Sequence, residues 1–417
     1  MKLRKFAAVS LSVAMVATMF TGCGNEEKES KDSNEKSSKE STAESFTDAI
    51  EKASKIKNYD YEMDMEISLG GSEVETMLAD ESAAEILDTL GIDGDEIKVK
   101  VTFDGKVKGE DAYQMAVGYE FGKFSGELTE VVYVDDMAYI NIADIVDLAE
   151  QVGKAFDVEE EISTYTTLIP EGDYIAISKD SIEDVYDAVM SQSGVSLSDI
   201  ESMDEEKIQE VSLYLLEEVE KIAKAADGAY STKDGYTITV NQDNLVSVMG
   251  AFIGVFAEDG EEIIEKIESI TGDLGVSADE LNEELKETDM EELESELESE
   301  MEDFGDFEFS MSADCTGKEG AAVCTIGYGF NADIEGVKMN IALNCKITEN
   351  DDVSIKAPSS VMAEEDLNAL LSLAGYDSMD DLIDEIVSAS SYSDDYSIYD
   401  DDYYEDNYDD LEDYDFN

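Results

Sequence analysis

The residues of this sequence best suited to covalent chemistry are its four cysteines, because histidine is absent. The lack of histidine removes the commonest general base, the base of Ser-His and Cys-His nucleophile pairs, and the usual zinc ligand. Paired carboxylates can catalyse hydrolysis, but the chain has 105 Asp and Glu residues and no spacing singles out one pair. No CxxC spacing and no phosphate-binding glycine loop occurs in the sequence. We therefore predict a protein that is not an enzyme, with no catalytic residue, metal site or cofactor.

Cys23 ends a segment that has the order of a bacterial export signal. Lys2, Arg4 and Lys5 precede an uncharged apolar stretch, residues 6–20, and a polar tract follows Cys23 at once. The apolar stretch is shorter than the roughly 20 residues that a transmembrane helix needs. We therefore expect residues 1–22 to be a signal peptide that is removed, and not a membrane span.

The run Phe20-Thr21-Gly22-Cys23 resembles the lipobox of bacterial lipoproteins, although Phe20 stands where Leu is usual. The resemblance implies cleavage between Gly22 and Cys23 and transfer of a diacylglyceryl group to the Cys23 thiol. Acyl chains such as palmitate anchor a protein stably when two are present, whereas a single chain binds only marginally. The resemblance thus implies a lipid-anchored protein on the extracytoplasmic face of a bacterial, Gram-positive cell membrane. The alternative is an ordinary secretory signal in which Cys23 has no role.

The charge of the chain excludes some partners. Its formal net charge is −78, because 27 Lys and Arg residues stand against the 105 acidic ones. Nucleic-acid binding depends on Lys and Arg that displace counterions from phosphates, so we predict no nucleic-acid partner. Residues 23–45 are polar, and residues 392–417 alternate Tyr with Asp and Glu, so neither segment has enough apolar surface to fold. We expect a flexible tether and a disordered acidic tail that attracts a cationic partner or divalent ions.

An alternation of apolar and polar residues is the main pattern between Phe46 and Pro358. In residues 59–69, Tyr, Met, Ile and Leu alternate with acidic residues and Ser, which is typical of a strand with one buried face. Short glycine-bearing connections between such segments predict an antiparallel meander. The other predicted strands are 97–103, 113–121, 128–134, 137–142, 173–178, 229–232, 236–241, 307–315, 324–330, 337–347 and 353–355. Helices are expected at 46–56, 143–156, 181–191, 205–226, 245–256 and 363–389.

The other three cysteines, Cys315, Cys324 and Cys345, lie on the apolar faces of the last three long strands. One hairpin places Cys315 opposite Cys324, and the next places Cys324 opposite Cys345. The sequence does not choose between these two disulfides, since both fit the cross-strand distance that a disulfide requires. A third alternative is three buried free thiols that pack as small hydrophobic side chains.

The order of these features resembles extracytoplasmic lipoproteins with the LolA-like or LppX-like fold. The resemblance depends on an anchoring cysteine, a tether, an opening helix, the strand at 59–69 and a long meander that ends before Pro358. It implies an α+β domain, residues 46–358, with a large curved antiparallel sheet of about eleven strands. In that fold the sheet forms an open half-barrel, and helices inserted across one face enclose an apolar cavity. Residues 359–391 are expected to form a helical appendix to this domain.

In that family the cavity holds lipid or acyl chains, so the resemblance implies a hydrophobic or amphipathic ligand between sheet and helices. The expected lining consists of aromatic and Met residues on the strand faces: Tyr61, Met63, Tyr113, Met115, Phe307, Phe309, Tyr328 and Phe330. The alternative function is a non-catalytic surface spacer or interaction lipoprotein, whose acidic helices and tail meet a cationic partner.

Overall fold

A computed structural model gives the structure of the chain. It describes residues 42–79, 81–92, 96–109, 112–166, 169, 173–179, 205–271, 281, 285, 295, 306–318, 320–334, 336–376 and 382. The predicted lipidation and cleavage residues Cys23 and Gly22, most of the predicted tether, the helix expected at 181–191 and the predicted tail at 392–417 lie outside the described residues. The chain divides into two compact units, residues 1–177 with 203–363, and residues 178–202 with 364–417. In the second unit the structure describes helix α13, Glu364–Ala374.

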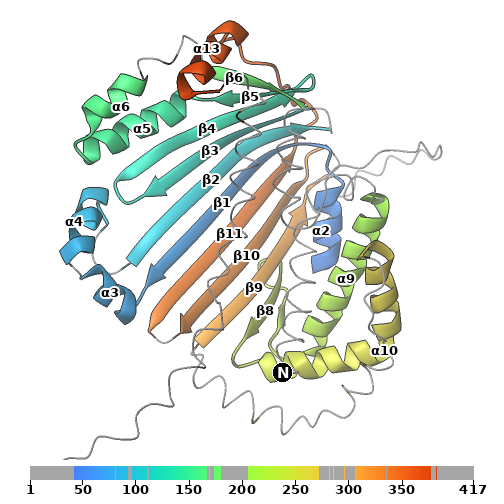
Figure 1. Cartoon of the computed structure of the whole chain (residues 1–417). Coiled ribbons are helices and arrows are strands. Elements are labelled where there is room, and N and C mark those ends of the chain that lie inside the picture. The colour runs from blue at the N-terminus through green and yellow to red at the C-terminus, as the bar shows by residue number, and fades with distance from the viewer. Residues whose placement is uncertain are drawn as a thin grey trace, which may run out of the picture. The chain divides into compact units, whose positions relative to one another are not determined.

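Eleven strands of the first unit form one antiparallel sheet (Figure 1). Their order across the sheet is β6-β5-β4-β3-β2-β1-β11-β10-β9-β8-β7, so β6 and β7 are the edges and the sheet is open. The bounds are β1 Asn58–Gly70, β2 Glu96–Lys108, β3 Ala112–Phe121, β4 Phe124–Val134, β5 Met137–Asn141, β6 Tyr174–Ser178, β7 Tyr230–Ser231, β8 Tyr236–Asn241, β9 Asp306–Thr316, β10 Val323–Ile334 and β11 Val337–Glu349. The predicted α+β class and the count of about eleven strands are confirmed.

The first and last strands of this sheet lie side by side at its centre. β1 pairs with β11 over twelve residues, from Tyr59 opposite Glu349 to Gly70 opposite Lys338. The chain runs outward from β1 to one edge at β6, and it returns to the centre from the other edge at β7. The β1–β11 pairing thus joins segments that are almost 300 residues apart in the sequence. Forming this pairing costs more chain entropy than forming any hairpin of the sheet, because the loop that it closes is much longer.

Alternation along the strands gives the sheet an apolar face and a polar face. On the polar face, acidic residues of β1 pair with lysines of the two neighbouring strands. The lysine Nζ atom lies 2.6 Å from a carboxylate oxygen in Lys98–Glu66, 3.3 Å in Lys100–Asp64 and 3.1 Å in Lys346–Glu62. Cross-strand ion pairs of this kind each contribute a few tenths of a kcal/mol up to about 1 kcal/mol, and they favour the observed register.

The described helices of the first unit lie around the ends of the sheet and against its β8–β10 part (Figure 1). Their bounds are α2 Phe46–Ser54, α3 Ser72–Leu78, α4 Glu81–Leu90, α5 Ala143–Ala155, α6 Glu159–Thr166, α9 Glu205–Ala225 and α10 Leu245–Thr271. Helix α2 packs on β9 and β10, α9 packs against α2 and α10, and α5 packs against β4. The deepest core therefore lies where α2 and α9 meet the β7–β10 part of the sheet, and it includes Phe46, Leu216, Ile238, Met311 and Cys324.

Helix α2 is held against α9 by its N-terminus. The Ser45 hydroxyl caps the helix by accepting a hydrogen bond from the Asp48 amide. The buried carboxylate of Glu220, from α9, accepts hydrogen bonds from the Phe46 and Thr47 amides, at 3.1 and 3.0 Å, and from the Thr47 hydroxyl at 2.7 Å. A carboxylate at this end of a helix is favoured both by the free amide groups and by the helix dipole.

Three helices and one segment differ from the sequence predictions. Helices α3, α4 and α6 were not predicted, and residues 353–355 are not a strand of the sheet. A strand is impossible there beside β11, because β1 and β10 already pair with both of its edges. Val353 and Ile355 instead bury their side chains against Ala112 and Val132. The chain then reaches β6, where Val361 forms a bridge with Tyr174.

Candidate functional site

The eight residues predicted to line a ligand site all lie on strands, in two groups. Tyr61, Met63, Tyr113 and Met115 belong to β1 and β3, on either side of β2. Phe307, Phe309, Tyr328 and Phe330 belong to β9 and β10. The sheet therefore separates the two groups by β11, and they do not form one cluster.

The first group surrounds a gap in the side chains of β2. Gly105 stands between Tyr61 and Met115 in the cross-strand row. A Cβ atom at Gly105 would lie 2.5 Å from Cζ of Tyr61, so the tyrosine ring occupies the space that a side chain would need. The Tyr61 ring also contacts Tyr59, with ring centroids 6.2 Å apart, and Tyr113 stacks on Tyr133 at 5.3 Å. Burial raises the pKa of Tyr61 to about 12, so its phenol is neutral at physiological pH.

Two residues of the second group pack against the hydrophobic core. Phe309 and Tyr328 pack against the buried cluster that α2 and α9 complete, and Phe330 stands opposite Phe309 in the β9–β10 register. Phe307 lies near the start of β9, where it borders a hollow at the ends of the strands. Phe309 and Tyr328 are thus core side chains of the domain.

The apolar face of β11, β1, β2 and β3 differs from that core. Most of its Tyr, Met, Ile, Val and Leu side chains are partly buried. Tyr113 is exposed, and among the described residues of this face Val117 is the one buried apolar side chain. In contrast, Ile238, Met311, Cys315 and Cys324 of the neighbouring strands are almost inaccessible to solvent. This side of the sheet therefore keeps apolar surface within reach of a ligand.

The structure chooses one of the two cysteine pairings. Cys315 and Cys324 are directly opposite each other in β9 and β10, and a disulfide bond joins them. Cys345 is a free thiol, opposite Ile326 of β10 and Met63 of β1. Its pKa is raised by burial, so it stays protonated and packs as a small apolar side chain. The register, which the sequence did not determine, places Cys345 two positions along the β10–β11 ladder from the residue opposite Cys324.

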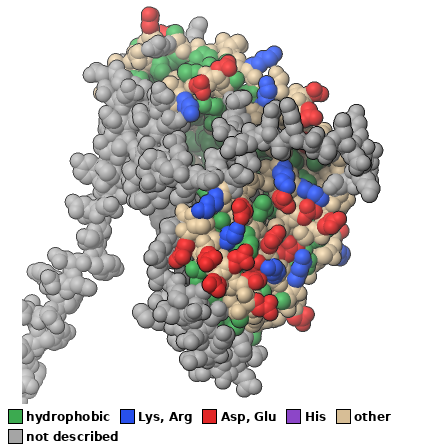
Figure 2. All heavy atoms as spheres, turned by 90° about the vertical axis from the view of Figure 1, so that its right-hand side faces the viewer, with side chains coloured by type: hydrophobic (Ala, Val, Ile, Leu, Met, Phe, Trp, Pro, Cys, Tyr) green, Lys and Arg blue, Asp and Glu red, His purple; other side chains and the backbone are tan. Residues whose placement is uncertain are grey.

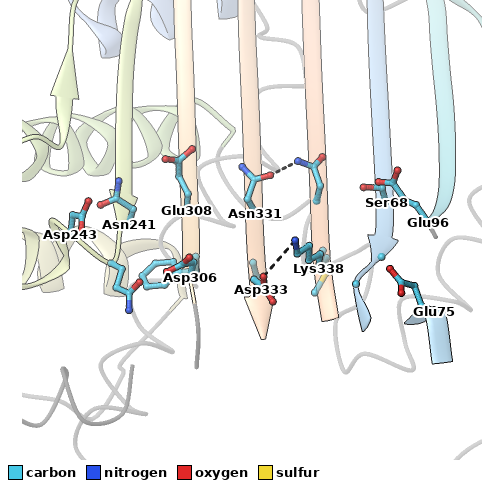
Figure 3. Close-up of a pocket in the computed structure, with 17 residues that line it drawn as sticks. Ser68, Glu75, Glu96, Asn241, Asp243, Asp306, Glu308, Asn331, Asp333 and Lys338 are labelled. Atoms are coloured by element: carbon cyan, nitrogen blue, oxygen red, sulfur yellow. Dashed lines mark hydrogen bonds and ion pairs between the residues drawn. The ribbon is translucent and has the colours of Figure 1, made fainter. Parts of the chain in front are cut away.

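A hollow of about 780 Å³ lies at the ends of six strands and was not predicted (Figure 3). The strand register places one row of polar side chains across its floor, all on the polar face: Asn241, Glu308, Asn331, Asn340 and Ser68. Within this row the Asn340 amide donates a hydrogen bond to the Asn331 amide oxygen. A second row, nearer the strand ends, holds Asp306, Asp333, Lys338 and, beyond Gly70, Glu96.

A second hollow, of about 640 Å³, lies along α9 and α10. Figure 2 shows this side of the molecule, where acidic side chains are interspersed with lysines. Lys266 pairs with Glu210 across the two helices, and Lys221 lies 3.3 Å from the Asp259 carboxylate. Lys221 also pairs with Glu218 of α9, which is 3% exposed and whose pKa is raised by burial. These pairs hold the two helices together, so the hollow is a groove in a helix interface.

Comparisons with known proteins found no match to any family model, any curated protein or any solved structure. Within the described ranges, no helix is both long enough and apolar enough to span a membrane. No group of three or more Cys, Asp or Glu side chains in the described part of the chain is placed to hold a metal ion.

Proposed function

We propose that this chain is a lipid-anchored bacterial lipoprotein whose open sheet binds a hydrophobic or amphipathic ligand, outside the cytoplasm. The sheet would be the wall of a LolA-like half-barrel. The observation that supports ligand binding is the apolar face of β11, β1, β2 and β3, where Tyr61, Met63 and Met115 are only partly buried. Each such side chain gains roughly 25 cal/mol for every Å² that a ligand removes from water. A lipid-modified Cys23 would keep this face close to membrane lipid.

The anchor predicts where the protein is found in the cell. Wild-type protein expressed in a Gram-positive host should stay in the membrane fraction, because two acyl chains bind a bilayer stably. The variant Cys23→Ser should lose the diacylglyceryl mass and leave the membrane fraction, as measured by cell fractionation and intact-mass spectrometry. Equal membrane association of the two proteins would contradict lipidation at Cys23.

Lipid binding on the apolar face predicts that lysine substitutions on the two faces of β3 have different effects on the amount of bound lipid. Met115 lies on the apolar face, and its neighbour Ala116 lies on the polar face opposite Asp104 and Glu130. Met115→Lys should reduce the amount of non-covalently bound lipid about tenfold or more, because a ligand would bury an unpaired ammonium group. Ala116→Lys should have no such effect, since its new charge meets two carboxylates on the other face.

Both variants are made in the Cys23→Ser protein, so that all lipid recovered is non-covalent. Protein purified from bacteria is extracted with organic solvent, and the extract is quantified by mass spectrometry. Equal lipid in the two lysine variants, or a wild-type sheet without lipid, would contradict the carrier function. A lipid-free domain would leave the alternative, a spacer or interaction lipoprotein that meets a cationic partner through its acidic surfaces.

A further inference from the structure

The contact between helices α9 and α10 holds two carboxylates on a single ammonium group. The two helices lie side by side (Figure 1), and α10 packs chiefly against α9. The Nζ atom of Lys221 in α9 lies 2.5 Å from Oε1 of Glu218 and 3.3 Å from Oδ2 of Asp259 in α10. One ammonium group balances the charge of one carboxylate. The cluster therefore keeps an excess negative charge when both acids are ionised.

Glu218 is the member of this cluster that solvent hardly reaches. Its side chain is 4% exposed, whereas the side chains of Asp259 and Lys221 are 34% and 52% exposed. Its second oxygen, Oε2, is buried and has no hydrogen-bond partner among the described residues. Buried polar side-chain atoms are nearly always paired, and a buried charge without a partner is strongly unfavourable. Glu218 therefore needs a partner that the neighbouring side chains do not supply in its ionised form.

A proton is the partner that fits this geometry. Protonated Glu218 can donate a hydrogen bond to the Asp259 carboxylate. The two acids then carry one negative charge together, which Lys221 balances. Burial raises the pKa of Glu218, Lys221 lowers it and Asp259 raises it, and the net result is a raised pKa. Two acids that share a site in this way titrate as a pair, with one proton held more tightly.

The other titratable groups around Glu218 do not replace this proton. Tyr214 lies one turn earlier in α9, and its buried hydroxyl also lacks a partner in the described part of the chain. Burial and the charges of Glu218 and Glu262 raise the pKa of Tyr214 to about 12. Elements α2, β7 and β8 pack on the opposite side of α9, where the α2 amides and the Tyr230 hydroxyl pair with Glu220 instead.

We infer that the α9–α10 contact is a pH switch, in which one proton shared by Glu218 and Asp259 holds α10 on α9. Loss of the proton leaves a buried carboxylate facing a second one, so α10 separates from α9. A group whose pKa is raised by folding stabilises the contact fully below its unfolded pKa, about 4.5 for Glu. This stabilisation is lost as the pH rises through the folded pKa. The inference does not depend on the lipid-binding proposal.

Amide hydrogen exchange of the full chain, measured by mass spectrometry and corrected for the intrinsic effect of pH, tests this switch. In the wild type, the protection of residues 259–271 in α10 should fall about tenfold or more between pH 5 and pH 8, because an uncompensated buried charge is strongly destabilising. Peptides from the central strand β10 should show no such fall, since the opening is local. Equal protection of α10 at the two pH values would overturn the proposal.

Glu218→Gln should keep α10 protected at pH 8. Its amide donates a hydrogen bond to Asp259, as the protonated acid does, and it cannot ionise. Protection at pH 8 should therefore be about tenfold higher than in the wild type, a gain that a damaged fold would not produce. Glu217→Gln is the matched control, because Glu217 is an exposed carboxyl group of the same helix and should leave the pH dependence unchanged. Wild-type exchange in Glu218→Gln would contradict the role of the proton.

Lys221→Gln distinguishes a shared proton from an ordinary ion pair. Without the ammonium group, the two acids hold their proton more tightly, so the loss of α10 protection should move to higher pH. An ordinary ion pair between Lys221 and Glu218 would instead give the same loss of protection at pH 5 and at pH 8. That result would also overturn the proposal.

Discussion

Replacing Glu220 by alanine should lower the free energy of unfolding by about 3 kcal/mol or more, because it leaves buried hydrogen-bond donors without an acceptor. Glu220 is 4% exposed. Its carboxylate accepts hydrogen bonds from two amides and the Thr47 hydroxyl at the N-terminus of α2, and from the Tyr230 hydroxyl. Lys224 pairs with it at 2.9 Å. One side chain thus joins α2, α9 and β7.

The Glu220 effect should depend on pH in a defined direction. Burial alone would raise the pKa of Glu220, but hydrogen bonds from Tyr230, Thr47 and Lys224 outweigh burial and lower the pKa to about 2. The pKa of an unperturbed Glu side chain is about 4.5. A group whose pKa is lowered by folding stabilises the protein fully above its unfolded pKa. The contribution of Glu220 should therefore be complete above pH 4.5 and disappear as the pH falls toward 2.

Urea unfolding of Glu220→Ala at neutral and acidic pH measures both effects. Glu217→Ala is the matched control, because Glu217 lies in the same helix with an exposed side chain. The free energy of unfolding of Glu217→Ala should stay within about 0.5 kcal/mol of the wild-type value. Similar losses at both positions would show that α9 tolerates no substitution here, and would remove the special role of Glu220.

Phe46→Ala should be the most destabilising truncation of a core side chain, with a loss of about 3–5 kcal/mol. Phe46 is 1% exposed and belongs to the cluster that joins α2 to α9 and to the β8–β10 part of the sheet. Removal of its ring would leave a cavity that rigid strands on one side and α9 on the other cannot close. The loss is read from the midpoint of chemical unfolding.

Phe156→Ala provides the same substitution at a different place. Phe156 follows α5 and is 41% exposed, so its truncation should cost about 0.5 kcal/mol or less. A loss at Phe46 no larger than the loss at Phe156 would contradict the position of the core at α2. It would also weaken the distinction between a filled side of the sheet and a side left open for ligand.

The strands could be predicted because alternation is a local property. Residues 59–69 carry the period of a half-buried strand in their own sequence, and β1 spans Asn58–Gly70 in the structure. The Asp234-Gly235 pair is likewise a local signal for a tight hairpin turn. In the structure these two residues have the positive φ angles, 61° and 103°, that such a turn requires. Helix α4 also had a local signal, in apolar residues spaced three and four apart over 86–90, and it was overlooked.

The sequence by itself thus determined which residues share a face of a strand, and that the chain has apolar strand faces beside a highly acidic surface. Only the tertiary structure decided which strands are neighbours and in what register. That register pairs Cys315 with Cys324, and it aligns Asn241, Glu308, Asn331, Asn340 and Ser68 in one row. The tertiary structure also gives Glu220 a role that its sequence does not show among 105 acidic residues, because packing of α9 against α2 brings its carboxylate to the start of α2. The physical reason is that pairings across almost 300 residues depend on the packing of the whole domain, which no local pattern encodes.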